Sequence, residues 1–330
     1  MNLQLSIGLP SNPRTWPIFG GEVKADGIDL VPSVVPATVL FWRQLRFADF
    51  DVSEMSLSSM ITANSRGDDR WVGLPIFTTR RFFHAGILVR RDAGIRGPSD
   101  LKGKRMGVPE YQQTGALWMR GVLQHEFGVT PADMEFWAER TPFHDEGGGT
   151  GFTPPPGVTI NRIPPEKNLG TMMLSGELRA ALYYRSEPNP IDRSTADLWN
   201  HPDFKPLFDD PVAEATRYCR ETGIYPINHG MVIRKEIAEK HPWVLLNLLK
   251  AFNFANEIAN RQRMEHVEYY LASGLLSREA KDALQTPIVQ HGIVANRHVL
   301  ETAARYAQEQ RLTPRLMQLD EIFAASTMSQ

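Results

Sequence analysis

Two histidines and one glutamate stand out in this sequence as side chains that could move protons. His84 lies in the segment TTRRFFHAG, His229 in TGIYPINHG and Glu110 in GVPEYQQTGALW. Histidine changes its charge near neutral pH, and a glutamate that is partly removed from water has a raised pKa and can stay protonated. We therefore predict that His84 or His229 acts as a general base and Glu110 as a general acid. The sequence leaves the choice of histidine open, and an exposed turn position is the competing interpretation for Glu110.

A second set of side chains could hold a carboxylate. Arg80 offers a planar fork of donors that fits two oxygens, and alternation along a strand puts it on the face of His84, opposite to Arg81. Thr114 begins a predicted helix, whose first amide groups can bind an anion, and Tyr111 could pack against an aromatic ring. A solvated arginine pair and plain helix caps are the competing interpretations. The predicted substrate-binding residues are Arg80, Ser58, Tyr111, Thr114 and Arg185.

Motifs for common cofactors are missing from the sequence. It contains no GxxxxGK[ST], no GxGxxG after a strand, no HExxH, no CxxC and no GxSxG. His84, His229 and Glu110 could form a two-histidine, one-carboxylate metal set if they converge, but their separations carry no ligand-spacing signal. We therefore expect neither a metal nor another cofactor.

Composition and charge favour a folded protein that binds a small molecule. Among the 330 residues, 36 Lys and Arg face 38 Asp and Glu, for a net charge of −2, so bulk charge gives no reason to expect a nucleic-acid or membrane partner. The single cysteine, Cys219, excludes an internal disulfide. No apolar run is long enough to span a membrane, and residues 3–9 alternate like a strand instead of forming a signal peptide. We expect a cytoplasmic protein.

Strand-like runs alternate with helical patterns along most of the chain, which predicts an α/β fold. Two Gly- and Pro-containing connectors, at 90–111 and 221–236, read as crossings between lobes. They predict a discontinuous lobe I, residues 1–88 plus 229–330, and a lobe II of residues 89–228, with a cleft at the hinge. The predicted strands are 3–9, 83–89, 105–108, 180–184 and 230–234, and the predicted helices are about 114–127, 242–258 and 299–310.

The segment 141–165, TPFHDEGGGTGFTPPPGVTINRIPP, is dense in Gly and Pro and has neither helical nor strand periodicity. Long irregular segments inside compact domains are usually functional or mobile. A lid or an oligomer contact, and a plain solvent loop, are the two interpretations that we leave open.

Several stretches together resemble one protein family over nearly the whole chain. TRRFFHAGILVR, GIRGPSDLKGKRMGVPEYQQTGALWMRGVLQHEFGV, LSGELRAALYYR and TGIYPINHGMVIR closely resemble the 4,5-dihydroxyphthalate decarboxylase family. The resemblance implies a two-lobe, periplasmic-binding-protein type II-like α/β fold with a central cleft at a two-strand hinge. Phe83 stands where the family pattern usually has a second arginine, which suggests a related acid instead of 4,5-dihydroxyphthalate itself.

The resemblance also implies a reaction, the non-oxidative decarboxylation of a hydroxylated aromatic carboxylic acid. The base, His84 or His229, would draw a proton from a ring hydroxyl. Glu110 would protonate the ring carbon that carries the carboxylate, and rearomatisation would expel CO2 without a cofactor. A non-catalytic solute-binding protein for an aromatic carboxylate is the alternative, and a homo-oligomer is left open.

Overall fold

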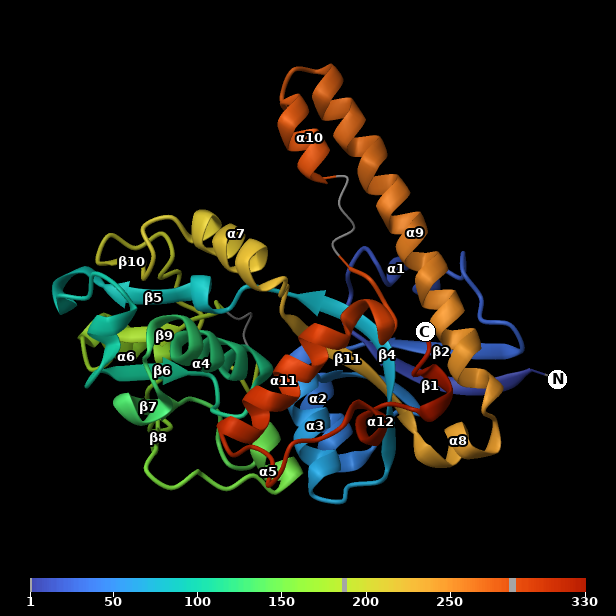
Figure 1. Ribbon diagram of the computed structural model, residues 1–330, viewed down its shortest axis with the longest axis horizontal. Coiled ribbons are helices and arrows are strands. Elements are labelled where there is room, and N and C mark those ends of the chain that lie inside the picture. Colours follow the sequence, from blue (N-terminus) through green and yellow to red (C-terminus); the bar gives the residue numbers. More distant parts are fainter. Residues whose placement is uncertain (1, 186–188, 285–288) are drawn as a thin grey trace.

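The computed structural model describes residues 2–185, 189–284 and 289–330, which form two mixed sheets covered by helices (Figure 1). In the first sheet, with strand order β2-β1-β3-β11-β4, β1 pairs in parallel with β2 and β3, and β11 runs antiparallel to β3 and β4. We call this sheet with its helices lobe I. Its strands are β1 (Leu3–Leu9), β2 (Ile28–Val34), β3 (Val52–Ser56), β4 (Trp71–Arg80) and β11 (Ile227–Arg234).

The second sheet, which with its helices we call lobe II, has the order β10-β5-β9-β6-β7-β8. Its β5 is antiparallel to both neighbours, whereas β9, β6, β7 and β8 are parallel. The carboxyl ends of these parallel strands therefore meet at one edge. The strands are β5 (Ile87–Arg90), β6 (Arg105–Val108), β7 (Glu135–Ala138), β8 (Thr159–Arg162), β9 (Ala180–Leu182) and β10 (Phe204–Pro206).

Helices follow most strands and cover both sheets (Figure 1). Those of lobe I are α1 (Trp16–Phe19), α2 (Ala37–Phe47), α3 (Leu57–Ser65), α8 (Lys235–Lys240), α9 (Trp243–Ala272), α10 (Arg278–Leu284), α11 (Arg297–Glu309) and α12 (Leu319–Ile322). Those of lobe II are α4 (Thr114–Phe127), α5 (Glu146–Thr150), α6 (Leu169–Ser175) and α7 (Pro211–Thr222). Within the described ranges, no helix combines the length and apolarity needed to cross a membrane.

Most of the predicted elements are found, although several differ at one end. The strand predicted at 230–234 begins at Ile227, and the helix predicted at 242–258 continues to Ala272. The strands at 3–9 and 105–108 and the helix at 114–127 have the predicted bounds, and Gly128 ends α4 in the left-handed region with φ 64°. The predicted strand 83–89 begins only at Ile87, because His84–Gly86 form a 3-10 turn closed by the Gly86 amide on the Phe83 carbonyl. The chain thus leaves lobe I after Arg80 and returns at Ile227. The predicted boundaries at 88/89 and 228/229 stay predictions.

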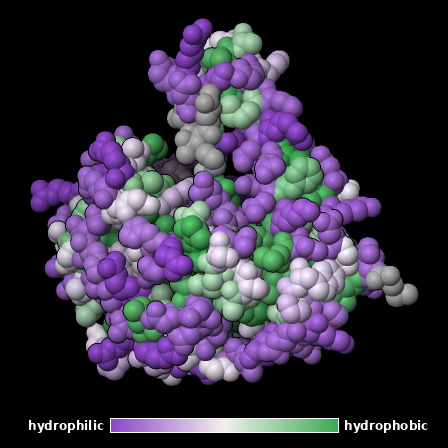
Figure 2. Space-filling model, turned by 45° about the vertical axis from the view of Figure 1, so that its right-hand side comes forward, coloured by the Kyte–Doolittle hydropathy of each residue, from purple (hydrophilic) through white to green (hydrophobic). Residues whose placement is uncertain are grey.

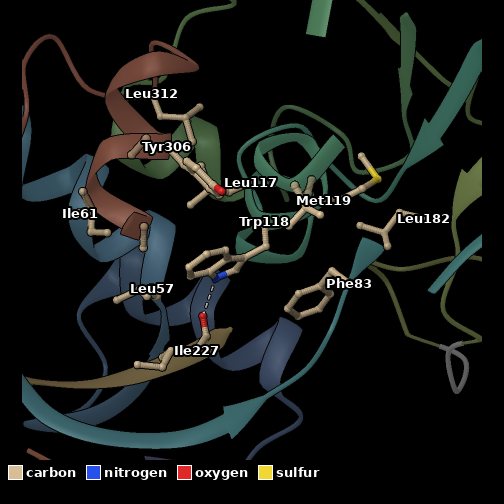
Figure 3. Close-up of a cluster of buried hydrophobic side chains, with 14 of the residues drawn as sticks. Leu57, Ile61, Phe83, Leu117, Trp118, Met119, Leu182, Ile227, Tyr306 and Leu312 are labelled. Atoms are coloured by element: carbon tan, nitrogen blue, oxygen red, sulfur yellow. Dashed lines mark hydrogen bonds between the residues drawn. The ribbon is translucent and has the colours of Figure 1, made fainter. Parts of the chain in front are cut away.

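One apolar cluster runs through both lobes. The indole Nε1 of Trp118, on α4, donates to the carbonyl of Ile227 on β11 at 2.8 Å, and its ring meets Tyr306 of α11 edge-on (Figure 3). Leu57 from α3 and Phe83 from the hinge belong to the same cluster. These contacts hold α4 of lobe II against β11 and α11 of lobe I.

Part of the segment 141–165 is buried between the lobes and is not a solvent loop. Asp145 caps α5 by accepting from the Gly148 amide at 2.6 Å. The helix packs on α2 and α3 of lobe I, with Glu146, Gly147 and Thr150 buried. The triple glycine permits this close approach, since a Cβ at Gly149 would come within 2.9 Å of Leu45.

A helical arm projects from lobe I (Figure 1). The 30 residues of α9 span about 45 Å, and α10 folds back on its outer end. Its buried residues lie almost all between Val244 and Ile258, whereas Tyr269 and Leu275 near the tip are exposed. Figure 2 shows a mixed hydrophilic and hydrophobic surface on this arm.

Candidate active site

The starts of α3 and α4 meet where the two lobes touch. The Thr114 hydroxyl accepts from the Ser58 amide at 2.9 Å and lies 2.8 Å from the Ser56 hydroxyl. The Ser58 hydroxyl donates to the carbonyl of Gln112 at 2.7 Å. Two of the predicted binding residues, Ser58 and Thr114, are thus in direct contact. We call this contact region between the lobes the seam, and the positive ends of α3 and α4 both point at it.

His229 lies one strand away from this contact. It is the antiparallel partner of Ser56 in the pairing of β11 with β3. Its Nδ1 is 2.5 Å from Oε1 of Glu54, its Nε2 is 2.7 Å from the side-chain nitrogen of Asn228, and its ring meets Phe41 edge-on at 4.7 Å. The imidazole is partly exposed, whereas Glu54 is fully buried. His229 is therefore both held in place and accessible.

Glu110 belongs to a buried cluster in which three carboxylates surround one guanidinium. Its Oε2 accepts from Nη1 of Arg140 at 3.2 Å and from the Glu146 amide at 2.9 Å. Arg140 also contacts Glu146 at 3.2 Å and Asp192 at 2.8 Å. Burial and the charge of Glu146 raise the pKa of Glu110 to about 8, although Arg140 opposes this. At neutral pH Glu110 is therefore mainly a neutral acid, and its Oε1 has no hydrogen-bond partner among the described residues.

The Glu110 cluster reaches across to lobe I. The Thr38 hydroxyl donates to Asp192 at 2.8 Å, and the Ser59 hydroxyl donates to Glu146. Thr38 lies one turn before Phe41 on α2, so the same face of this helix contacts both the Glu110 cluster and the ring of His229. The cluster that contains the predicted acid and one of the two predicted bases thus both contact the first turns of α2.

Arg80 does not join this group. Its guanidinium donates to the carbonyl of Tyr225 at 2.9 Å, to that of Gln290 at 3.3 Å and to the Asn296 side chain, and burial lowers its pKa to about 10. Both of its Nη groups are therefore bonded to the protein, whereas its buried Nε has no hydrogen-bond partner among the described residues. The predicted convergence of Arg80 with His84 is not found.

Arg81 is the arginine of the pair that faces a groove. Its guanidinium carbon is 4.8 Å from the centre of the Tyr184 ring. It lines an open groove of about 830 Å³ along the hinge, together with Phe82, Tyr225 and residues of α7.

His84 is also held away from the seam. It is fully buried in the 3-10 turn, with Nε2 3.2 Å from Oε1 of Glu214 on α7 and with Tyr218 against its ring. Although burial opposes it, hydrogen bonds from Arg217 and the nearby His84 ring lower the pKa of Glu214 to about 2. The prediction from strand alternation is wrong here because Phe83 and His84 are not on a strand. In the part of the chain that the structure describes, no group of three His, Cys, Asp or Glu side chains could hold a metal, so the considered metal set is not assembled.

Tyr111 and Arg185 both belong to lobe II and make no described contact with Ser58 or His229. The Tyr111 ring stacks on Phe152 and has the Arg120 guanidinium carbon 3.6 Å from its centre. It borders a cavity of about 240 Å³ inside lobe II that Glu110 also lines. Arg185 is exposed, with Asp197 at 3.8 Å.

Several side chains of the site were not predicted. Arg140 follows β7 by two residues, so the rule that ligands bind beyond the carboxyl ends of parallel strands could have found it. Glu146 begins the short helix α5 and Asp192 lies outside the helices and strands, and neither carries a periodic signal in the sequence. Glu54 and Asn228 are recognised only through the pairing of β3 with β11.

A relative that aligns with nearly the whole chain shows which family this chain belongs to. The sequence matches no protein-family model. A 4,5-dihydroxyphthalate decarboxylase of Comamonas testosteroni is 31% identical over 332 aligned positions, which cover 99% of this chain and 98% of the relative. The chain belongs to the 4,5-dihydroxyphthalate decarboxylase family. Another such decarboxylase, of Pseudomonas putida, is 34% identical over 220 positions, 66% of this chain and 82% of the relative.

Solved structures confirm the expected fold of this family member. The periplasmic aliphatic sulphonate binding protein SsuA of Escherichia coli superposes with a TM-score of 0.58 at 14% identity over 100% of both chains. The desulfurization enzyme DSZB superposes with a TM-score of 0.53 at 15% identity over 99% of this chain and 98% of that one. At these identities the likeness shows the two-lobe binding-protein fold alone.

Proposed function

We propose that this family member is a carboxy-lyase that removes CO2, without oxidation, from a hydroxylated aromatic, phthalate-like acid bound between its lobes. The observation that carries the proposal is the alignment with a 4,5-dihydroxyphthalate decarboxylase over 99% of the chain. A buried neutral carboxyl group and an accessible histidine at the same interlobe seam are the groups that such a reaction uses.

The proposed reaction begins with a proton transfer from a ring hydroxyl to Nε2 of His229. The electron density that this releases reaches the ring carbon bearing the carboxylate, and Glu110 protonates that carbon. The carbon–carboxylate bond then breaks, its electron pair restores the aromatic ring, and CO2 leaves. The phenolate oxygen takes its proton back from His229, and Glu110 is reprotonated from solvent, so that one carboxylate is replaced by one hydrogen. These reaction steps together consume one proton and require no cofactor.

Groups for the substrate carboxylates are proposed on both lobes. The other amide groups in the first turns of α3 and α4 are the proposed donors at the seam, since the Ser58 amide and hydroxyl already donate to Thr114 and Gln112. Arg81 lies in the hinge groove beside Phe82 and Tyr225. Arg81 replaces Arg80 in this role because both Nη groups of Arg80 already donate to carbonyls and to Asn296.

The finer proposal is a substrate related to 4,5-dihydroxyphthalate. At the position where we expected a family arginine, Phe83 is only 2% exposed and packs against the start of α4, where a Cβ on Gly115 would be 2.8 Å from its ring. This position therefore offers no charge to a carboxylate.

Turnover of a small series of acids tests the proposal. Purified protein is incubated with 4,5-dihydroxyphthalate, 4-hydroxyphthalate and phthalate, and CO2 and the aromatic product are measured. We expect CO2 from at least one hydroxylated acid and none from phthalate, which lacks the hydroxyl that the base deprotonates. Glu110→Gln should lower kcat about 10²- to 10⁴-fold with little change in KM.

Binding of these acids without CO2 release would contradict the proposal and support a solute-binding protein. The proposal includes a cytoplasmic location, which fractionation of cells that express the protein checks.

A further inference from the structure

Glu54 and His229 form a closely matched pair on neighbouring strands. In the antiparallel pairing of β3 with β11, Ser56 lies opposite His229 and Glu54 lies opposite Met231. Glu54 and His229 are thus diagonal neighbours across the ladder, and their side chains meet with Nδ1 2.5 Å from Oε1. The side chain of Glu54 is 0% exposed and that of His229 13%. The carboxylate is therefore out of reach of a substrate, whereas the imidazole is not.

The two neighbours of the ring fix where its proton lies. An ionised carboxylate can only accept, so the hydrogen bond to Glu54 requires a proton on Nδ1. The side-chain nitrogen of Asn228 can only donate, so its contact of 2.7 Å with Nε2 requires a lone pair there. Together these contacts describe a neutral imidazole with its proton on Nδ1 and a basic Nε2.

A partly buried guanidinium, that of Arg14, interacts electrostatically with Glu54. Arg14, whose guanidinium donates to the carbonyl of Thr78 at 2.6 and 3.0 Å, has its pKa lowered by burial, and the negative charge of Glu54 opposes that change. The second oxygen of Glu54 has no hydrogen-bond partner among the described residues, so Nδ1 of His229 is the contact that the structure gives this carboxyl group. A buried negative charge beside the ring stabilises the imidazolium that forms when Nε2 takes a proton.

We infer that Glu54 is a positioning residue of the decarboxylase, which holds His229 with its proton on Nδ1 so that Nε2 takes the proton of the substrate hydroxyl. This inference rests on the proposed function. The substrate hydroxyl replaces the Asn228 amide at Nε2, and the edge-on contact with Phe41 keeps the ring plane fixed during the exchange. Glu54 gives up no proton, and the imidazolium returns its own to the phenolate after CO2 has left.

His84 supplies a matched comparison within the same chain. It also faces a carboxylate, with Nε2 3.2 Å from Glu214, but it is 0% exposed and the described residues give neither ring nitrogen a well-formed hydrogen bond. No substrate reaches this imidazole without unpacking α7. Glu214 is therefore the control for a carboxylate that contacts a histidine without serving the reaction.

The test measures CO2 release from the acid that the wild type turns over best. It compares the wild type with three variants, Glu54→Gln, Glu54→Asp and Glu214→Gln. We expect Glu54→Gln to lower kcat about 10²- to 10⁴-fold at nearly unchanged KM, because the amide cannot stabilise an imidazolium. Glu54→Asp, which keeps the charge, should recover part of the loss, and Glu214→Gln should keep the wild-type kcat. Wild-type kcat in Glu54→Gln, or an equal loss in Glu214→Gln, would overturn the inference.

Nitrogen NMR of protein labelled in its histidines separates the inference from the proposed function. The His229 signals, assigned from their loss in His229→Asn, should show a protonated Nδ1 and an unprotonated Nε2 in the wild type at neutral pH. The opposite tautomer would overturn the inference even if CO2 is released. Absence of CO2 release from every acid, with the Nδ1 tautomer present, would instead contradict the proposed function. Because this measurement uses the wild type, it stands even if a Glu54 variant fails to fold.

Discussion

Glu110 should make the stability of this protein depend on pH in a direction opposite to that of an ordinary paired carboxylate. Burial and Glu146 raise its pKa from 4.5 to about 8 in the folded state. Between these two values the folded chain holds a proton that the unfolded chain has released, so the free energy of unfolding falls as pH rises. At 1.36 kcal/mol for each pH unit, the loss between pH 5.5 and 7.5 is about 3 kcal/mol. In Glu110→Gln, which mimics the neutral acid and does not titrate, this loss should be absent.

Urea unfolding of the wild type and of Glu110→Gln at several pH values between 5.5 and 8 measures this difference. The gap between the two free energies of unfolding should shift in favour of the variant by about 3 kcal/mol as pH rises from 5.5 to 7.5. Glu166→Gln, at an exposed position, is the matched control and should track the wild type. If the free energies of unfolding of the wild type and Glu110→Gln change in parallel with pH, Glu110 is ionised in the folded protein. That result would contradict its role as the acid in the proposed reaction.

Two further substitutions separate packing from binding. In Gly121→Ala the new Cβ would lie 2.0 Å from the Tyr306 ring, so we expect the free energy of unfolding in urea to fall by about 1–3 kcal/mol. Gly97→Ala is the control, because Gly97 is extended and a Cβ there would have nothing within 4 Å, so stability should not change. Arg80→Lys cannot span the carbonyls of Tyr225 and Gln290. It should lower the melting temperature and leave KM for the substrate unchanged; a raised KM with normal stability would return Arg80 to the binding site.

The sequence was informative wherever a local rule was sufficient. Phe127 followed by Gly128 marked the end of α4, and the apolar spacing from Leu117 to Leu123 marked the face that packs in the shared core. The alternation of residues 3–9 predicted β1 with its observed bounds. These features depend on neighbours in the chain, so a single sequence was enough for them and for the α/β class.

The arrangement of the site depended on contacts that the chain order does not reveal. Arg80 and His84 were placed on one face by assuming a continuous strand, and the 3-10 turn at His84–Gly86 breaks that alternation. The partner of Glu54, His229, lies 175 positions away in the chain and is reached only through the pairing of two strands. The direction of the Glu110 pKa was predictable from burial, whereas the parts played by Arg140 and Glu146 were not.

Because one apolar cluster is built from α4 on one side and from α3 and α11 on the other, unfolding of either lobe exposes apolar surface of the other, even though each lobe also has a cluster of its own. Heating should therefore produce a single endotherm whose calorimetric and van't Hoff enthalpies agree, despite the two separate sheets. A chain with two separate sheets would then unfold as one cooperative unit.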